Sequence, residues 1–306
     1  MNFSVTILGS GAATPTLGRH CSSQIVNING FKILLDCGEA TQNQMRAYHQ
    51  RLLSFDTIFI SHLHGDHWFG LPGLISSFHL CGRSEPLDIF APEGLKPVIE
   101  SILQISGSGL QYELRIHEIK CEQPSTIFQN KMCSVKAFPL LHSVPTYGFI
   151  FEENQPLLNL KKDARRQYNL TDIECQKLKQ GQDLVRDDGS ILPYSELTLP
   201  RKTSRRYAYC CDTGYFESIA DIVRGVDLLC LESTFDLSLQ SLADERQHLT
   251  ASQAAQIAAD AQVKQLLLTH FSARYKQIDT LANESQAIFK NVILADDGKT
   301  YEITST

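Results

Sequence analysis

A cluster of histidine and aspartate side chains stands in the first quarter of the chain, directly after the apolar run TIFI. The segment SHLHGDHW, residues 61–68, holds His62, His64, Asp66 and His67 within six positions. A lone histidine is usually a packing or surface residue, but four ligand-type side chains at one strand end indicate a metal site. In an irregular turn, His62 and His64 can point the same way while Asp66 and His67 turn toward a second point. That geometry suits two adjacent ions better than one. Imidazole and carboxylate donors without a nearby cysteine favour zinc or a similar divalent ion in an open site.

Three more ligand candidates each follow an apolar strand pattern later in the chain. They are His142 after SVKAFPLL, Asp212 after RYAYCC and His270 after KQLLLT. Strand ends often carry site residues, because the strand fixes the backbone and the loop leaves the side chain free. Each residue alone would be a weak candidate. As a set they complete seven ligands, which serve two metals if Asp212 bridges them.

The elements that must position these residues are strands and helices mixed along the chain. Alternation and apolar runs predict strands at residues 3–8, 23–28, 31–36, 57–61, 87–91, 112–119, 125–129, 133–140, 146–151, 205–212, 227–233, 265–270, 291–295 and 300–303. Helical spacing predicts helices at residues 39–49, 68–80, 95–105, 171–179, 216–224, 252–261 and 282–289. The mixture, with strand hairpins at both ends, predicts an α/β fold of two packed sheets flanked by helices.

The segment at residues 153–203 is different, because it is polar and has little periodicity outside a short helix. We interpret it as an insertion or arm. Residues 161–206 contain 11 basic and 7 acidic residues, a balance of +4, whereas the whole chain has a net charge of −6. A locally basic segment on an acidic body can contact phosphates. Charge alone also fits an ordinary solvated surface.

Length and composition limit the class of protein. With 306 residues and 42% apolar residues, the chain can form one large α/β domain or two smaller ones. No apolar run approaches the roughly 20 residues that span a bilayer, so we expect no membrane contact. The start, MNFSVTILGSGAATP, has the pattern of a strand rather than a signal peptide. Nine cysteines without a CxxC pair favour reduced thiols and a cytoplasmic protein.

The motifs together resemble the metallo-β-lactamase superfamily and, within it, the short form of the ribonuclease Z family of tRNA 3′-processing endonucleases. HLHGDH matches the HxHxDH signature, and the resemblance covers nearly the whole chain. The HSVPTYGF run at His142, HLTASQAA and THFSARY favour ribonuclease Z over lactamases and glyoxalases. Further matching pieces are LGSGAATP, LLDCGEATQNQ, DHWFGLPGLI, CDTG and LESTF.

The resemblance implies a metallo-β-lactamase-like αββα sandwich of two mixed sheets flanked by helices. It implies one domain over residues 1–306, with an inserted substrate-binding arm at about residues 153–203. It also implies two divalent ions per chain, Zn²⁺ with Mn²⁺ as the alternative. One ion would be held by His62, His64 and His142, the other by Asp66, His67 and His270, and Asp212 would bridge them. The implied activity is removal of 3′ trailers from tRNA precursors, leaving a tRNA 3′-hydroxyl, by a homodimer in which one subunit's arm serves the other's site.

Three residues are candidates for the proton transfers. The resemblance implies that Asp66 is the general base beside the attacking water. His248, in QHLTASQAA, is our candidate for the acid that protonates the leaving oxygen. Thr250 can cap the following helix, and a helix N-terminus disfavours an imidazolium, so a carboxylate must keep His248 charged. Glu232 is the candidate for that carboxylate, and a purely structural hydrogen-bond role is its alternative.

The sequence departs from the family pattern in places that concern substrate binding. Leu17 and His20 stand where relatives often have Lys and Asn, and Leu231 replaces a common His. The arm lacks the Gly-Pro-rich tip of many short forms. Two other functions therefore stay open. The same fold could hydrolyse a small ester or phosphodiester, or the chain could be a catalytically silent metalloprotein that binds RNA or another partner. The complete ligand set with Asp66 and His248 counts against the silent form.

Overall fold

The computed structural model describes residues 2–304, apart from residues 108, 156, 187–188 and 201–202. The chain separates into two compact units. The main unit comprises Met1–Glu153 and Arg205–Thr304, and the inserted unit comprises Asn154–Ser204. All of the candidate site residues belong to the main unit. Among the described residues, no helix has the length and apolar character that crossing a bilayer requires.

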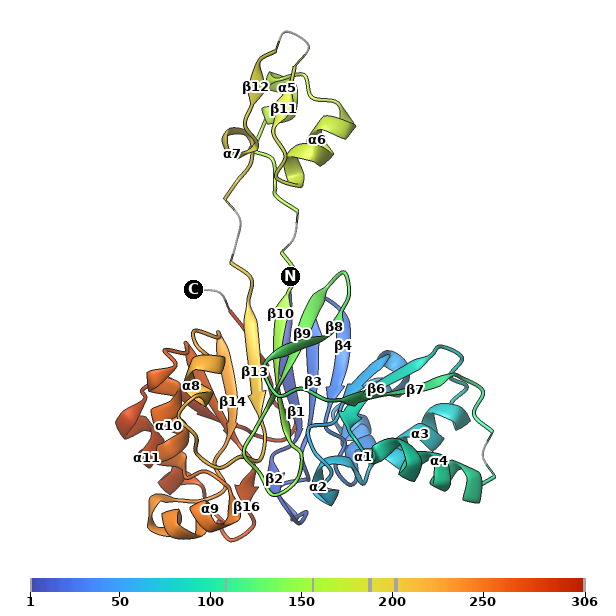
Figure 1. Ribbon diagram of the computed structural model, residues 1–306, viewed down its shortest axis with the longest axis vertical. Coiled ribbons are helices and arrows are strands. Elements are labelled where there is room, and N and C mark those ends of the chain that lie inside the picture. Colours follow the sequence, from blue (N-terminus) through green and yellow to red (C-terminus); the bar gives the residue numbers. More distant parts are fainter. Residues whose placement is uncertain (1, 108, 156, 187–188, 201–202, 305–306) are drawn as a thin grey trace. The chain divides into compact units, whose positions relative to one another are not determined.

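Two seven-stranded mixed sheets form the centre of the main unit (Figure 1). The strand order in the first sheet is β18 (Thr300–Glu302), β1 (Phe3–Gly9), β3 (Ser23–Ile28), β4 (Phe31–Leu35), β5 (Thr57–Phe59), β6 (Leu87–Pro92) and β7 (Leu114–Ile119). The order in the second sheet is β17 (Val292–Leu294), β15 (Gln265–Thr269), β14 (Leu228–Glu232), β13 (Arg206–Cys210), β10 (Tyr147–Glu153), β9 (Cys133–Pro139) and β8 (Ser125–Gln129). A short parallel pair joins β2 (Gly11–Ala12) to β16 (Phe271–Ser272).

Both sheets have the same internal plan, with a parallel half beside an antiparallel half. In the first sheet, β4 to β7 are parallel. In the second, β13, β14, β15 and β17 are parallel. The residues of β14 are all buried and those of β15 nearly so, as expected for parallel strands covered on both faces. The loops with the histidine cluster, Asp212 and His270 therefore follow strands of the parallel halves, whereas the loop with His142 follows the antiparallel strand β9.

Helices cover the outer face of each sheet (Figure 1). The first sheet is covered by α1 (Thr41–Ala47), α3 (Leu71–Leu80) and α4 (Leu95–Ile105), which share a buried cluster with it. The second is covered by α8 (Ile219–Ile222), α10 (Ala251–Asp260) and α11 (Asp279–Ile288). Shorter helices in the loops are η1 (Leu52–Ser54), α2 (Gly65–Trp68), η2 (Leu237–Leu239) and α9 (Gln240–Arg246). This arrangement confirms the expected α/β sandwich of two mixed sheets flanked by helices.

Aromatic side chains fill the space between the sheets. Phe59 of β5 lies with its ring centroid 5.3 Å from that of Phe149 and 5.8 Å from that of Phe151, both on β10 of the other sheet. Ring pairs at this distance add to the free energy gained by burying their area. Because Phe59 directly precedes the histidine-rich loop, this packing fixes the start of that loop.

Some elements differ from the expectation. The helix expected at residues 68–80 begins only at Leu71, as α3, because Pro72 fits the first turn of a helix, and a separate short helix, α2, ends at Trp68. The helix expected at residues 216–224 is shorter, and α9 was not expected at all. These helices are short, so their apolar periodicity is weak.

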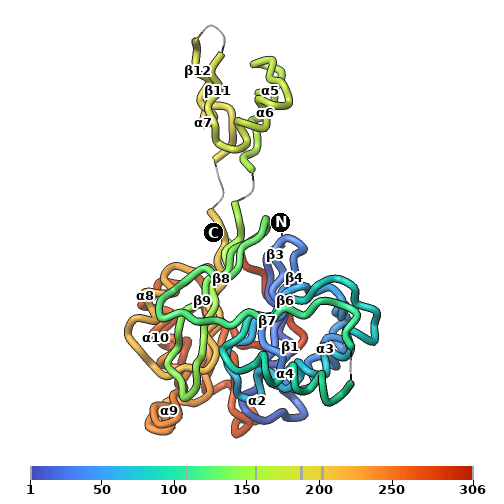
Figure 2. Tube along the Cα trace, turned by 45° about the vertical axis from the view of Figure 1, so that its right-hand side comes forward, coloured from blue at the N-terminus to red at the C-terminus, as the bar shows by residue number. Residues whose placement is uncertain are grey.

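The inserted unit has a small core of its own. It contains α5 (Ala164–Gln167), α6 (Asp172–Lys179), α7 (Tyr194–Leu197) and a hairpin of β11 (Leu184–Val185) with β12 (Ile191–Leu192). Figure 2 shows these helices gathered beside the hairpin. Buried side chains in this core are Ala164, Leu170, Cys175, Leu178, Leu184 and Leu197. A capping box between Thr171 and Glu174 begins α6.

Candidate metal centre and active site

The candidate site residues gather where strands of both sheets end. The histidine-rich loop follows β5 of the first sheet, and His142 follows β9 of the second. Asp212 follows β13 and His270 follows β15, whereas Glu232 is the last residue of β14. The structure therefore brings together, from both sheets, the seven ligand candidates that are scattered over more than 200 positions of the sequence.

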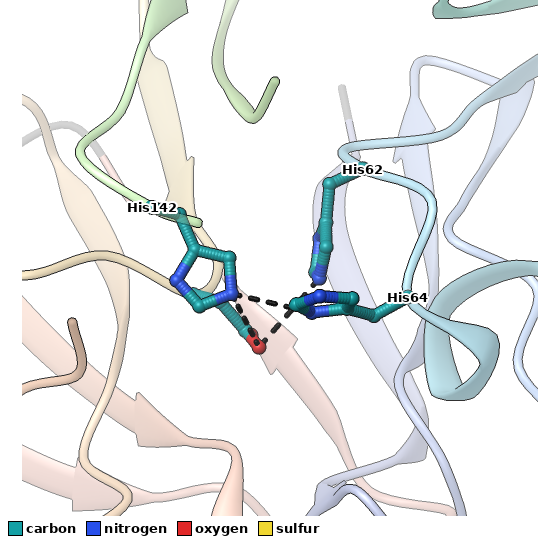
Figure 3. A group of neighbouring side chains, drawn as sticks. His62, His64 and His142 are labelled. Carbon is teal, nitrogen blue, oxygen red and sulfur yellow. Dashed lines mark hydrogen bonds and ion pairs between the residues drawn. The ribbon is translucent and has the colours of Figure 1, made fainter. Parts of the chain in front are cut away.

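Three imidazoles and one carboxylate form the first group. His62, His64 and His142 each offer a ring nitrogen, and these atoms lie with an Asp212 oxygen within 4.8 Å of one another. Figure 3 shows the three rings converging from two separate loops. His142 Nε2 lies 3.2 Å from His64 Nδ1. This separation matches the roughly 3.3 Å expected between two ligands that are each 2.0–2.1 Å from one tetrahedral ion.

Asp66, His67 and His270 form the second group, with their ligand atoms again within 4.8 Å of one another. Asp66 Oδ2 lies 3.4 Å from His270 Nε2 and 3.6 Å from His67 Nε2. The same oxygen accepts a hydrogen bond of 2.8 Å from the backbone N–H of Ala13, which fixes the carboxylate.

Asp212 lies between the two groups and presents one oxygen to each. Its Oδ1 is 3.1 Å from His270 Nε2 and 3.3 Å from His67 Nε2. Its Oδ2 is 3.6 Å from His62 Nε2 and 3.8 Å from His142 Nε2. A carboxylate in this position can bridge two cations.

Several of these buried ligand atoms lack a hydrogen-bond partner in the structure. Among the described residues, they include His62 Nε2, His67 Nε2 and Asp212 Oδ1. A buried polar atom without a partner is costly, and a metal ion is one way to satisfy it. The donor set of imidazole nitrogens and carboxylate oxygens, without a thiolate, suits Zn²⁺ and similar divalent ions. The residues therefore fit divalent metal binding.

The protonation of each His and Asp side chain in the cluster depends strongly on the charges of its neighbours. Burial favours the neutral form of the His67 ring, but the nearby Asp212, Asp66 and Asp36 carboxylates raise its pKa well above the ordinary value. Burial opposes the charge of Asp212 too, yet the surrounding histidines, His270 first, hold its pKa well below normal. For His62, burial dominates and its pKa is lowered. The carboxylates are thus held ionised, as metal ligands must be.

His248 and Glu232 form a hydrogen-bonded pair beside the metal ligands. His248 Nδ1 lies 2.8 Å from Glu232 Oε1, and the Glu232 side chain is fully buried. Burial alone would lower the pKa of His248, but the charge and hydrogen bond of Glu232 raise it to about 9. Thr250 caps α10 through a capping box with Gln253, as expected. The pair therefore supplies a protonated imidazole near neutral pH.

Four of the ten described non-glycine residues with positive φ lie at the site. Non-glycine residues with φ between +54° and +60° include Ala13, Asp36, Gln247 and His270. Left-handed φ costs free energy for such residues and persists only where surrounding contacts enforce it. Each of these residues touches the cluster. Gln247, for example, offers its carbonyl 3.1 Å from His142 Nδ1.

Sequence reasoning missed one buried carboxylate next to the ligands. Asp36 is fully buried, and its Oδ2 accepts hydrogen bonds from His67 Nδ1 at 2.7 Å and from the Tyr209 hydroxyl at 2.8 Å. The sequence did contain a signal for it. Asp36 is the last residue of the apolar strand pattern FKILLD, just as Asp212 directly follows RYAYCC. A histidine ligand commonly donates its second ring N–H to such a carboxylate.

A cavity of about 460 Å³ opens onto the cluster. Its walls include the ligands His64, Asp66 and His142, together with Arg246 and Arg274. Arg274 lies over the Phe235 ring at 5.0 Å and donates to Ser272 Oγ, so its guanidinium is held at the wall. The cavity thus combines acidic ligands with arginines that can contact phosphate.

Comparisons with known proteins agree with this geometry. The family model of the anti-Pycsar protein Apyc1 matches residues 3–182, and the model of the beta-lactamase superfamily domain matches residues 186–271. A ribonuclease Z of Bacteroides thetaiotaomicron is 42% identical over 96% of this chain and 93% of its own length. A ribonuclease Z of Anoxybacillus flavithermus is 38% identical over 97% of this chain and 96% of its own length.

A solved structure gives the same result. The chain is similar to the short form of human tRNase Z, with a TM-score of 0.72, 27% identity and coverage of 99% of this chain and 100% of the human one. The similarity therefore includes the sheets, their helices and the loops that carry the ligand candidates. The chain belongs to the metallo-β-lactamase superfamily and, within it, to the ribonuclease Z family.

Proposed function

We propose that this protein is a metal-dependent endoribonuclease that removes 3′ trailers from tRNA precursors and leaves a 3′-hydroxyl on the tRNA. One observation carries the proposal. A chain about 40% identical to ribonuclease Z proteins over nearly its full length also holds the seven ligand candidates in one cluster beside the His248–Glu232 pair, and five of the seven, with His248, line one cavity. A catalytically silent relative would have no need for a charged imidazole beside the ligands.

The seven side chains would hold two divalent ions, with Zn²⁺ the best fit to their donor atoms and Mn²⁺ the alternative. His62, His64 and His142 would hold one ion, Asp66, His67 and His270 the other, and Asp212 would bridge them. The two oxygens of Asp212, which face different groups, support the bridging role. When bound, such ions neutralise the phosphate and make a water molecule acidic enough to ionise near neutral pH.

The protein's own groups would move the protons. Asp66, fixed by the Ala13 N–H, would accept the proton of the attacking water. His248, kept charged by Glu232, would donate its proton to the 3′-oxygen that leaves phosphorus. Glu232 would hold the Nδ1–H of His248, so that the Nε2–H is the one available to the substrate. General acid catalysis of this kind contributes roughly 10²–10⁴-fold to a rate.

The inserted unit would bind the tRNA part of the precursor. Lys161, Lys162 and Lys177 are exposed on it, and they support contact with phosphates. Arg165 is 63% exposed but paired with Asp172 at 2.8 Å, so it contributes less net charge. Asp187, Asp188, Arg201 and Lys202 also belong to the basic segment but lie outside the described residues.

We also propose a cytoplasmic homodimer. Val98, Ile102 and Ile105 form an exposed apolar stripe on one face of α4, and Leu80 at the end of α3 is exposed as well. Exposed apolar residues grouped on one helix face support a protein contact. The free state of all nine thiols supports a reducing compartment. Light scattering on the purified chain would measure the subunit number.

One assay tests the proposed function against hydrolysis of a small ester or phosphodiester. The purified chain, supplied with Zn²⁺ or Mn²⁺, is given a tRNA precursor with a 3′ trailer and, separately, bis-p-nitrophenyl phosphate. We expect cleavage of the precursor at the trailer junction with a much higher kcat/KM than for the small substrate. Preference for the small substrate, without precursor cleavage, would reject the endoribonuclease function.

A further inference from the structure

Two buried carboxylates, one from each sheet, organise the histidines of the site in the same way. Asp36 follows β4 and Glu232 ends β14. Each accepts a hydrogen bond directly from one histidine, His67 for Asp36 and His248 for Glu232. Each also accepts a hydrogen bond from the hydroxyl group of a neighbouring Ser or Thr. These hydroxyls in turn contact two further histidines.

On the second sheet the hydroxyl belongs to Thr234. Its Oγ1 lies 2.6 Å from Glu232 Oε2 and 2.9 Å from His270 Nδ1, and the carbonyl of His270 is 3.1 Å away. A hydroxyl has one proton to donate. The carboxylate takes that proton, because it is closer than the carbonyl and charged. The remaining lone pairs can only accept, so His270 must donate its Nδ1–H to Thr234.

On the first sheet the hydroxyl belongs to Ser61. Its Oγ donates to Asp36 Oδ2 at 2.8 Å and lies 3.2 Å from His62 Nδ1. The Ser61 backbone N–H donates to the other carboxylate oxygen at 2.7 Å, which fixes the residue in place. The remaining neighbour of His62 Nδ1 is the Cys211 sulfur at 3.9 Å, a weak partner. The same reasoning makes His62 donate its Nδ1–H to Ser61.

We propose that Thr234 and Ser61 are positioning residues that set the tautomers of His270 and His62. Each hydroxyl donates a hydrogen bond to a carboxylate and accepts one from an imidazole that the carboxylate itself does not contact. The proton is held on Nδ1, and the lone pair of Nε2 is left facing the cluster, where it can bind a metal. The inference deepens the proposed metal site and rests on it, because the bound ion is what requires the lone pair of Nε2.

The opposite tautomer would be penalised at both ends of the ring. An unprotonated Nδ1 would face hydroxyl lone pairs, and an Nε2–H would occupy the nitrogen that must bind the ion. Without an ion, Asp212 Oδ1, which lies 3.1 Å from His270 Nε2, can accept that hydrogen, so the penalty at Nε2 applies to the metal-loaded chain. The His62 side chain is fully buried and His270 nearly so, so water cannot relieve either conflict. Removing one hydroxyl should therefore remove the support for the tautomer of one histidine and leave the other histidine unaffected.

Thr234→Val removes the hydroxyl and keeps the shape of the side chain, and Thr234→Ser is the matched control that restores the hydroxyl. Ser61→Ala is the equivalent change on the other sheet. The first readout is long-range ¹H–¹⁵N NMR of the Zn²⁺-loaded chain at mildly alkaline pH, which distinguishes protonated from unprotonated ring nitrogens. The second is Zn²⁺ affinity, measured by competition with a chromogenic chelator.

We expect the wild type and Thr234→Ser to hold His270 with the proton on Nδ1. In Thr234→Val, the Nδ1–H of His270 loses its acceptor, so its resonance should shift while that of His62 stays as it was, and Zn²⁺ affinity should fall by roughly 10–100-fold. Ser61→Ala should show the reverse pattern. Circular dichroism and the thermal midpoint would report any loss of the fold in the variants.

The wild-type spectrum alone can overturn the inference, because an Nε2–H on His270 or His62 contradicts it even if no variant folds. An unchanged His270 resonance and unchanged Zn²⁺ affinity in a folded Thr234→Val would also reject the positioning role. A wild type that binds no Zn²⁺ would instead reject the proposed metal site, whereas Zn²⁺ bound with an Nε2–H on either histidine would reject the positioning role alone.

Discussion

The metal centre and the inserted unit are built on opposite principles. In the centre, His62, His67 and Asp212 are buried and held by short contacts from two sheets. In the inserted unit, the charged side chains are exposed, Arg166 by 87%, around a small apolar core. Buried groups depend on a fixed geometry, whereas binding by exposed charges depends on how many charges there are and on how strongly salt screens them. On the proposed function, we expect the main unit to perform the chemistry and the inserted unit to provide affinity for the substrate.

This comparison predicts how each region responds to substitution. A single change in the centre should remove activity on every substrate, because each ligand has a unique position. A single change in the inserted unit should have a small effect that depends on salt and on the size of the substrate.

The largest effect is expected for Asp212→Ala. Because each Asp212 oxygen faces a different ligand group, its loss should remove both metals and reduce activity on all substrates to background. Elemental analysis of the wild type should find two ions per chain, and of the variant none. A wild type that holds one tightly bound ion would contradict the two-ion centre.

His248→Ala should have the next largest effect, a loss of roughly 10²–10⁴-fold in the rate of precursor cleavage with the metals retained. The loss should be much smaller for a nitrophenyl phosphodiester, because nitrophenolate leaves without needing a proton. Glu232→Gln should show the same pattern more weakly, since it removes the charge that raises the pKa of His248. An equal loss of rate on both substrates would mean that His248 only packs beside the site and does not donate the proton.

A moderate effect, confined to large substrates, is expected for Lys161→Ala combined with Lys162→Ala. If each lysine neutralises one phosphate, the slope of log affinity against log salt should fall by about 2 for the precursor. Binding at low salt should weaken accordingly, and the rate on a small phosphodiester should not change. A salt slope equal to that of the wild type would exclude these lysines from the contact.

The smallest effect on activity is expected at Glu153 and Arg205, which border the insertion and form a two-point ion pair. Arg205 Nη2 lies 2.7 Å from Glu153 Oε2, and Arg205 Nε lies 2.7 Å from Glu153 Oε1. Burial would raise the pKa of Glu153, but Arg205 lowers it below its usual value. Glu153→Gln should lower the free energy of unfolding at pH 7 by roughly 1–3 kcal/mol.

The pH dependence of that difference has a definite sign. Because the folded-state pKa of Glu153 is depressed, its contribution is complete above the unfolded value of about 4.3 and is lost as pH falls below it. Urea unfolding at several pH values should therefore show wild type and Glu153→Gln converging in acid. A difference that stays constant from pH 7 to pH 3 would mean that the pair's charge contributes nothing.

Much of the fold and of the candidate site could be predicted from the sequence. The rule that polar residues at strand ends meet in space selected His142, Asp212 and His270, and the structure brings them to the histidine-rich loop. The rule works for Asp212 and His270 because apolar strand patterns are strong and parallel strands end together, whereas His142 follows the antiparallel strand β9. The carboxylate Asp36 obeys the same rule and was overlooked because no histidine adjoins it.

Other features had no readable signal. Ser61 and Thr234 are common residue types, and only their distances to a carboxylate and an imidazole give them a role. The inserted unit likewise shows weak periodicity, because its helices are four to eight residues long and its core is small. In both cases the decisive contacts join residues whose own sequence neighbourhood is unremarkable.

The most direct test of the division between chemistry and substrate binding is a chain in which residues 154–204 are replaced by a short Gly-Ser turn. The replacement suits the main unit, because β10 and β13 are antiparallel neighbours with Glu152 opposite Arg206. We predict that kcat/KM for a tRNA precursor falls by roughly 10²-fold or more, a loss of about 2.7 kcal/mol, with no change for a small phosphodiester. An equal fall on both substrates, or none on the precursor, would contradict the account.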